Sequence, residues 1–134
     1  MPGDRPASLL LDTHLLLWAA FEPDRLSPTA RLILQSRAVP LLFSLATVWE
    51  VAIKTSLGRA DFSVDPGRFH RALLAEGFVE LPITAPHLVR VGALSWVHRD
   101  PFDRLLVAQA IEEDLTLLTA DATLKRYGNF VTVV

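Results

Sequence analysis

The sequence holds four acidic side chains set among apolar neighbours: Asp12, Glu50, Asp103 and Asp121. Asp12 stands between two runs of leucine, and although it could form a turn with Thr13, an acid is rare in such surroundings. Carboxylates that share a site raise each other's pKa, and a divalent cation offsets their repulsion. Mg²⁺ and Mn²⁺ prefer oxygen ligands, and a cation held by carboxylates can activate water and stabilise a phosphoryl oxygen. The pattern indicates a Mg²⁺ or Mn²⁺ site suited to phosphodiester hydrolysis.

Elements that would position these acids follow from the alternation of apolar runs and amphipathic segments. Short apolar runs predict buried strands at residues 7–13, 39–44, 78–84, 115–121 and 129–134. Helices are predicted from His14 to near Pro23 and at 28–36, 45–58, 66–76, 86–94 and 101–114, with one helical turn at 122–127. Strands that alternate with helices are typical of a parallel sheet covered on both faces. We expect a single three-layer α/β domain over residues 8–134, with a five-stranded, mainly parallel sheet and a flexible tail at 1–7.

Ligands of open parallel sheets bind outside the carboxyl ends of the strands. Asp12 follows the first predicted strand, and Asp121 follows the fourth. Ser44 ends the second strand, with Glu50 about two helical turns further on, and Asp103 begins the helix before the fourth strand. Four carboxylates from four separate segments are therefore expected to meet at one edge of the sheet.

Each of these acids also has a structural interpretation. Glu50 could pair with Lys54, four residues on in the same helix. Asp100 precedes a proline and fits a helix N-cap, while Asp103 falls in the first helical turn, where acids are common. Asp121 could cap the short helix after it. The common position of the four acids at one edge favours a functional site over four separate caps.

Basic and aromatic residues near these acids allow more than one role. His98 has no second histidine at metal-ligand spacing, so the pattern favours a loop histidine over a ligand. Arg104 could pair with an acid nearby or contact a phosphate, and Lys54 and Arg99 are further candidates for contacts with a phosphate backbone. The tryptophans are expected in the core or at an interface rather than as platforms for stacked bases: Trp18, Trp49 and Trp96.

Composition narrows the class of protein. The 134 residues include no cysteine, which excludes disulfides, thiolate metal sites and a cysteine nucleophile. No apolar run is long enough to span a bilayer, and the mixed charges of the N-terminal segment do not fit a signal peptide, so we expect a cytoplasmic protein. The net charge of −2 does not exclude a nucleic-acid substrate, because basic residues outnumber acidic ones once the four candidate acids are set aside.

Four motifs in fixed order resemble those of PIN-domain proteins of the VapC toxin type. They are LLLDTHLLLW, SLATVWEVAIK, HRDPFDRLLVAQA and LLTADATLKRYG, and the similarity runs from about Leu9 to Val134. One such motif is weak, but the four in this order and spacing are specific. The resemblance implies a PIN-like α/β fold and a Mg²⁺- or Mn²⁺-dependent endoribonuclease. Its catalytic and metal-binding acids match Asp12, Glu50, Asp103 and Asp121.

The resemblance also implies supporting residues and partners. Thr13 and Thr119 match hydroxyl positions beside the acids, and Ser44, Asp100 and Arg104 are further supporting candidates. RNA is the implied substrate, with its backbone received by Lys54, Arg99 and Arg104. The implied protein partner is a small antitoxin that covers the acidic groove. A hydrophobic content of 51% fits either such a hetero-oligomer or a homodimer.

Two other functions fit the same class of fold. A phosphoreceiver domain requires paired acids after the first strand and a lysine near the start of the last one, whereas Asp12 is followed by Thr13 and Lys125 is not in that position. A non-catalytic RNA- or protein-binding module of PIN-like fold requires no metal. We expect the endoribonuclease, with the binding module as the main alternative.

Overall fold

The structure is a computed structural model that describes residues 8–58 and 62–134, so the predicted tail at 1–7 lies outside the described residues. Five parallel strands form one sheet in the order β3-β2-β1-β4-β5. Their bounds are Leu9–Leu11 (β1), Leu41–Ser44 (β2), Val79–Leu81 (β3), Thr116–Thr119 (β4) and Val131–Val133 (β5). The predicted five-stranded α/β fold is confirmed, and the sheet is wholly rather than mainly parallel.

One or more α-helices connect each of the first four strands to the next, and a 3₁₀ helix connects β4 to β5. The α-helices are Thr13–Phe21 (α1), Pro28–Ser36 (α2), Leu45–Ser56 (α3), Pro66–Ala75 (α4), Ala85–Ala93 (α5) and Pro101–Glu112 (α6). The 3₁₀ helices are Pro23–Arg25 (η2) and Ala122–Tyr127 (η3). Within the described residues, none of these helices combines the length and apolar character needed to cross a membrane.

Helix starts are set by short polar side chains followed by proline, as the sequence predicts. Ser27 accepts a hydrogen bond from the Ala30 amide at the start of α2, and Asp100 caps α6 in the same way. Proline is favoured at the first helical position because it has no N–H to leave unpaired and its φ is already helical. After α3, Gly58 has a φ of 69°, a left-handed conformation that suits glycine.

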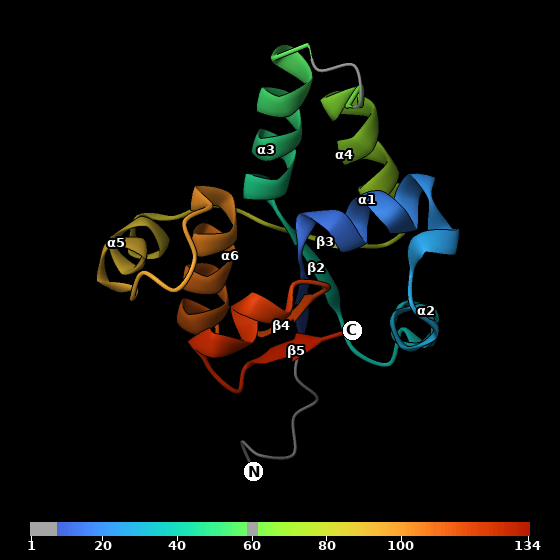
Figure 1. Ribbon diagram of the computed structural model, residues 1–134. Helices are drawn as coiled ribbons and strands as arrows, with labels where there is room; N and C mark the ends of the chain where they lie inside the picture. Colours follow the sequence, from blue (N-terminus) through green and yellow to red (C-terminus); the bar gives the residue numbers. More distant parts are fainter. Residues whose placement is uncertain (1–7, 59–61) are drawn as a thin grey trace.

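Neighbouring residues of each strand pack on opposite faces of the sheet and form two cores. Leu11 and Leu118 pack with α1, α2 and α4, whereas Leu10 and Leu117 pack with α6 and η3. Figure 1 shows α5 and α6 on one side of the sheet and α1 and α2 on the other. The three central strands β1, β2 and β4 are largely buried on both faces and have polar side chains only at their ends, whereas the edge strands β3 and β5 are more exposed and carry Glu80 and Thr132 in their middle.

Two strands end earlier than predicted because an acid starts a helix at once. β1 stops at Leu11, and the Asp12 side chain accepts a hydrogen bond from the Leu15 amide at the start of α1. β4 stops at Thr119, and Asp121 caps η3 in the same manner. These short strand-to-helix turns place both acids at the carboxyl edge of adjacent strands, since β1 pairs directly with β4.

Candidate active site

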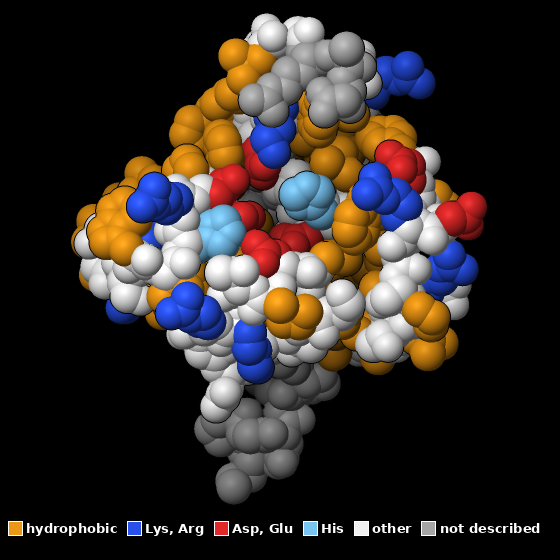
Figure 2. Space-filling view, in the orientation of Figure 1, with side chains coloured by type: hydrophobic (Ala, Val, Ile, Leu, Met, Phe, Trp, Pro, Cys, Tyr) orange, Lys and Arg blue, Asp and Glu red, His pale blue; other side chains and the backbone are white. Residues whose placement is uncertain are grey.

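Acidic side chains surround a hollow on the face of the molecule shown in Figure 2, near the ends of α1, α3 and α6. Histidines lie beside these acids, and lysine and arginine side chains stand further out. Asp12 and Glu50 are each only 3% exposed, whereas Asp103 and Asp121 are partly exposed. The contacts described next connect Asp12, Asp121 and Asp103, and Glu50 lies near enough for its charge to act on Asp103.

Asp12 is held on both carboxylate oxygens. Its Oδ1 accepts from the Leu15 amide at 2.9 Å, and its Oδ2 accepts from the Thr119 hydroxyl and from the Ala120 amide at 3.2 Å. Thr119 Oγ1 in turn accepts from the Asp121 amide at 3.0 Å, so one hydroxyl connects two of the acids. Burial raises the pKa of Asp12 above its ordinary value, despite the opposing effect of these hydrogen bonds.

Glu50 is bound by a threonine hydroxyl on one oxygen and by a lysine on the other. Thr13 donates to Glu50 Oε1 at 2.8 Å, and Lys54 Nζ lies 2.6 Å from Oε2. Thr13 Oγ1 is also 3.0 Å from Thr47 Oγ1, and because Thr13 gives its single hydrogen to Glu50, Thr47 must be the donor to Thr13. The structure thus brings both predicted roles of Glu50 together, as a member of the acidic group and as the partner of Lys54.

Asp100 and Asp103 have different contacts at the start of α6. Asp100 Oδ1 accepts from the Phe102 amide at 2.8 Å and from the Asp103 amide at 3.1 Å, which makes Asp100 the N-cap. The Asp103 side chain instead faces the other acids. Burial raises the pKa of Asp103 to about 7, and the negative charges of Asp100 and Glu50 contribute to the same shift.

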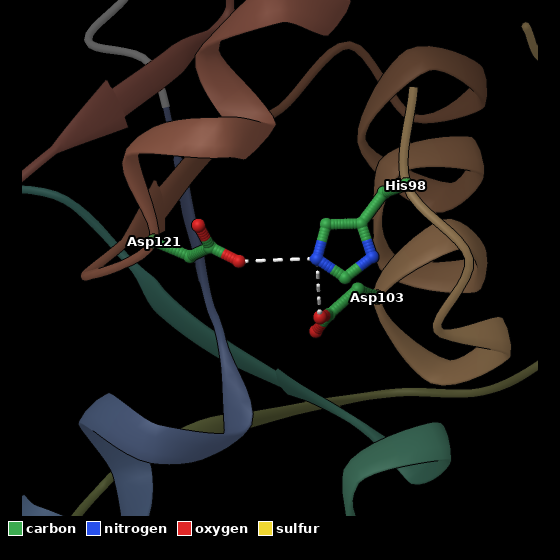
Figure 3. A group of neighbouring side chains, drawn as sticks. All are labelled: His98, Asp103 and Asp121. Atoms are coloured by element: carbon green, nitrogen blue, oxygen red, sulfur yellow. Dashed lines mark hydrogen bonds and ion pairs between the residues drawn. The ribbon is translucent and has the colours of Figure 1, made fainter. Parts of the chain in front are cut away.

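His98 is a residue of the site that sequence reasoning placed only in a loop. Its Nε2 lies 3.1 Å from Asp121 Oδ2 and 3.5 Å from Asp103 Oδ2, as Figure 3 shows. Its Nδ1 accepts a hydrogen bond from the Asp100 amide at 3.1 Å, so in the neutral ring the hydrogen resides on Nε2. In this arrangement His98 donates to the carboxylates and offers them no lone pair.

The hydrogen bond from His98 changes the electrostatics of Asp121. Burial alone would raise the pKa of Asp121, but hydrogen bonds from the Thr123 amide and from His98 outweigh it and lower the pKa. Sequence contained a signal for this contact, because His98 lies only two residues before the cap Asp100 and therefore shares its turn. A metal-ligand search based on histidine spacing does not detect it.

Ser44 and Arg104 serve the fold rather than the acidic group. Ser44 is buried, and its hydroxyl accepts from the Ala46 amide at 2.9 Å, so it fixes the start of the helix that carries Glu50. Arg104 is only 3% exposed and lies 3.9 Å from the ring centroid of Trp96. Its guanidinium donates, over 2.9–3.4 Å, to the carbonyls of Val91, Leu94, Ser95 and His98 and to the Tyr127 hydroxyl.

The expectation that Arg104 contacts an RNA phosphate therefore disagrees with the structure, because its terminal N–H groups are already bonded inside the protein. Arg99 is exposed, and Lys54 is partly exposed beside Glu50, so both remain candidates for backbone contacts. Trp49 and Trp96 are not core residues, with exposed fractions of 52% and 78%.

The motifs that suggested a family can now be compared with known proteins. A family model of the PIN domain matches residues 9–129. The chain belongs to the PIN domain family. No sequence among the curated proteins matches it. The match includes β1 to β4 and all of the helices and ends just before β5, so the acidic hollow lies within this PIN domain.

Three solved structures, one of them a toxin–antitoxin complex, resemble this PIN domain in fold. VapBC2 from Rickettsia felis, bound to a DNA fragment from the promoter, has a TM-score of 0.66 at 19% identity over 95% of this chain and 97% of that one. A toxin–antitoxin complex from Klebsiella pneumoniae has a TM-score of 0.64 at 20% identity over 93% and 96%. FitAcB from Neisseria gonorrhoeae has a TM-score of 0.53 at 21% identity over 86% and 88%.

The donor set of this PIN domain fits a hard divalent cation. The four acids would supply only carboxylate oxygens as ligand atoms, which Mg²⁺ and Mn²⁺ prefer. Ligand atoms of His98, Asp103 and Asp121 lie within 4.8 Å of one another. Among the described residues, Lys54 is the only lysine or arginine that forms an ion pair with one of the four acids, so their negative charge is largely uncompensated.

The raised pKa of Asp103 predicts how the metal-free protein responds to pH. Because the folded protein holds this proton up to about pH 7 and the unfolded chain releases it near 3.8, the free energy of unfolding falls as pH rises between these values. Asp103→Asn cannot ionise and avoids this loss. From about pH 5 to about pH 8, the variant should gain roughly 2–3 kcal/mol relative to wild type, as measured by urea unfolding in EDTA. A stability difference independent of pH would contradict the shift.

The buried guanidinium of Arg104 predicts a large structural effect. Arg104→Met leaves carbonyls of the 91–98 segment without their donor and should lower the free energy of unfolding by at least about 3 kcal/mol. Arg99→Met removes an exposed arginine nearby and should change it by no more than about 0.5 kcal/mol. Thermal unfolding of both variants tests this, and equal stabilities would show that Arg104 does not hold the segment.

Proposed function

We propose that this PIN domain is a VapC-like toxin: a Mg²⁺- or Mn²⁺-dependent endoribonuclease that hydrolyses RNA phosphodiester bonds and is neutralised by a cognate antitoxin. The observation that carries the proposal is the meeting of four carboxylates from four segments, with the pKa values of Asp12 and Asp103 both raised. Support comes from the family, since PIN domains are generally nucleases, and from the toxin–antitoxin complex of like fold.

The residues of the centre would hold the cation through Asp12, Asp103 and Asp121, with Glu50 as a further ligand, directly or through water. When bound, a divalent cation supplies the positive charge that activates a water molecule and neutralises the scissile phosphate. Thr119 keeps Asp12 oriented, Thr13 keeps Glu50 oriented, and one of the carboxylates accepts the proton of the attacking water.

The proposed partners are an RNA substrate and an antitoxin. The protein would be a homodimer or part of a toxin–antitoxin hetero-oligomer, in the cytoplasm. The toxin–antitoxin complex of like fold supports a protein partner, which could cover exposed apolar side chains of this domain. The most exposed are Leu32, Leu57, Val89 and Trp96, at 68%, 65%, 75% and 78%.

A non-catalytic PIN module is the alternative that one contact favours. The ion pair between Lys54 and Glu50 satisfies this carboxylate without any metal. In that case Asp12 and Asp121 would serve only as helix caps, Asp103 would have no ligand role, and neither metal binding nor hydrolysis would follow. Direct measurements of cleavage and of metal binding separate the two functions.

Loss of one carboxylate should abolish cleavage without loss of the fold. With Mg²⁺ or Mn²⁺, Asp103→Asn should cut a mixed RNA pool more than about 100-fold more slowly than wild type, since even residues that merely orient metal ligands are worth roughly 10- to 100-fold. Asp114→Asn, at an exposed left-handed position after α6, is the matched control and should cleave normally. Equal cutting by wild type and Asp103→Asn would mean that a contaminating nuclease is responsible.

Metal binding should be detectable apart from activity and should depend on pH. In a calorimetric Mn²⁺ titration the wild type should bind and Asp12→Asn should not. Because Asp103 must lose its proton before it can act as a ligand, affinity should weaken as pH falls below about 7, and binding at that pH should release protons. Wild-type affinity in Asp12→Asn would favour the non-catalytic module.

A further inference from the structure

A cleft with a volume of about 650 Å³ adjoins the carboxylate centre. It lies between α1, the second half of α3 and the segment that leads into α4, elements gathered on one side of the sheet edge in Figure 1. Thr13 and Lys54 line it, and both of them bond to Glu50. The cleft therefore opens directly from the site at which a scissile phosphate would bind.

Aromatic side chains form much of the wall. His14 and Trp18, one turn apart on α1, have ring centroids 5.9 Å apart, and Phe62 lies across the cleft with Lys54 Nζ 6.0 Å from its ring centroid. Trp18 and Phe62 are partly buried against the core, which fixes their positions. Aromatic faces held at the rim of a basic groove are the platforms on which single-stranded nucleic acids stack their bases.

The charges of the cleft suit a phosphate. Lys54, Arg25 and Arg68 line it together with two acids. Glu22 is engaged by Arg25 at 3.4 Å, and Asp65 caps α4 by accepting from the backbone amide of Arg68. The Arg68 guanidinium is exposed, and no carboxylate among the described residues pairs with it.

We propose that this cleft is a subsite for one unpaired RNA nucleotide adjacent to the cleaved phosphodiester. Its base stacks on Phe62 beside Trp18, whose own ring already carries the Arg25 guanidinium 5.0 Å from its centroid, and its phosphate is received by Lys54 and Arg68. The volume lies within the range of roughly 300–1,000 Å³ typical of ligand pockets. This inference rests on the proposed ribonuclease function and adds where a nucleotide that flanks the cleaved bond would bind and which side chains would receive it.

The aromatic wall at Phe62 and the positive charge of Arg68 can be tested separately by measurements of RNA binding. In the Asp103→Asn background with Mg²⁺, fluorescence anisotropy would measure the affinity for a labelled single-stranded RNA of random sequence. Phe62→Leu keeps an apolar side chain but loses the ring and should weaken binding at least about fivefold. Phe62→Tyr restores the ring and should bind within about twofold of the parent.

Arg68 has a matched control on its own helix. Arg68→Gln should weaken binding about three- to tenfold and reduce the slope of log affinity against log salt by about 0.7. Arg71→Gln, an equally exposed arginine of α4 outside the cleft, should change neither. In the otherwise wild-type enzyme, the two cleft variants should raise KM and leave kcat unchanged.

The outcomes distinguish this subsite from the proposed function. If wild type cleaves RNA but Phe62→Leu and Arg68→Gln bind and cleave normally, the subsite is wrong and the ribonuclease stands. If these variants lose RNA affinity although wild type never cleaves, the subsite stands and the catalytic proposal fails. If they keep RNA affinity and lose a co-expressed protein partner instead, the cleft is a protein-binding groove and the proposal is overturned.

Discussion

Electrostatic repulsion among carboxylates at the edge of the sheet is the constraint around which the surrounding contacts are arranged. A parallel sheet delivers Asp12 and Asp121 to adjacent strand ends, and the helices that flank it add Glu50 and Asp103. Burial disfavours the charged form of these carboxyl groups and so raises the pKa values of Asp12 and Asp103. The hydroxyls of Thr13 and Thr119, the amide groups of helix starts and the Nε2–H of His98 are the groups with which the protein offsets this cost.

A second layer of contacts holds these groups in place. The Tyr127 hydroxyl accepts from Arg104 and from the His98 amide and donates to the Ser95 carbonyl. Arg104 binds the same segment from the helix that carries Asp103. The segment before α6 is therefore tied to both α6 and η3, and this fixes the imidazole of His98 between Asp103 and Asp121 without regular secondary structure.

Sequence patterns predicted the parts of this site that depend on topology. An acid directly after an apolar run must lie at a strand end, so the positions of Asp12 and Asp121 followed once the strands were recognised. Asp103 followed from its place in the first turn of its helix, and Glu50 from its place about two turns into the helix after the second strand. The five-stranded fold was predictable for the same reason, but several elements were predicted too long: β1 and β4 stop early because an acid caps the next helix, and the strand predicted at 78–84 and the helices predicted at 45–58 and 101–114 also end sooner.

Contacts that depend on side-chain direction could not be predicted from one sequence. Thr47 lies three residues before Glu50 in the same helix. Nothing in that position distinguishes it from other threonines, so its hydrogen bond to Thr13 could not be predicted. Arg104 follows an acid in a motif that suggested a phosphate contact, yet the helical turn directs it to the opposite side, where loop carbonyls converge. Loop conformation decides such cases, and periodicity carries no information about it.

Lys54 contacts both the carboxylate centre and the aromatic cleft, so binding at one of these sites is energetically coupled to binding at the other. The same ammonium group lies 2.6 Å from Glu50 and faces Phe62 across the cleft. A change in the charge that Glu50 presents therefore alters how strongly Lys54 is held, and hence how freely it can turn to an anion in the cleft. Linkage makes this coupling reciprocal: whatever factor one site imposes on binding at the other is returned in full. A ligand bound in the cleft would therefore change the affinity of the centre for a cation by the same factor by which the cation changes the affinity of the cleft.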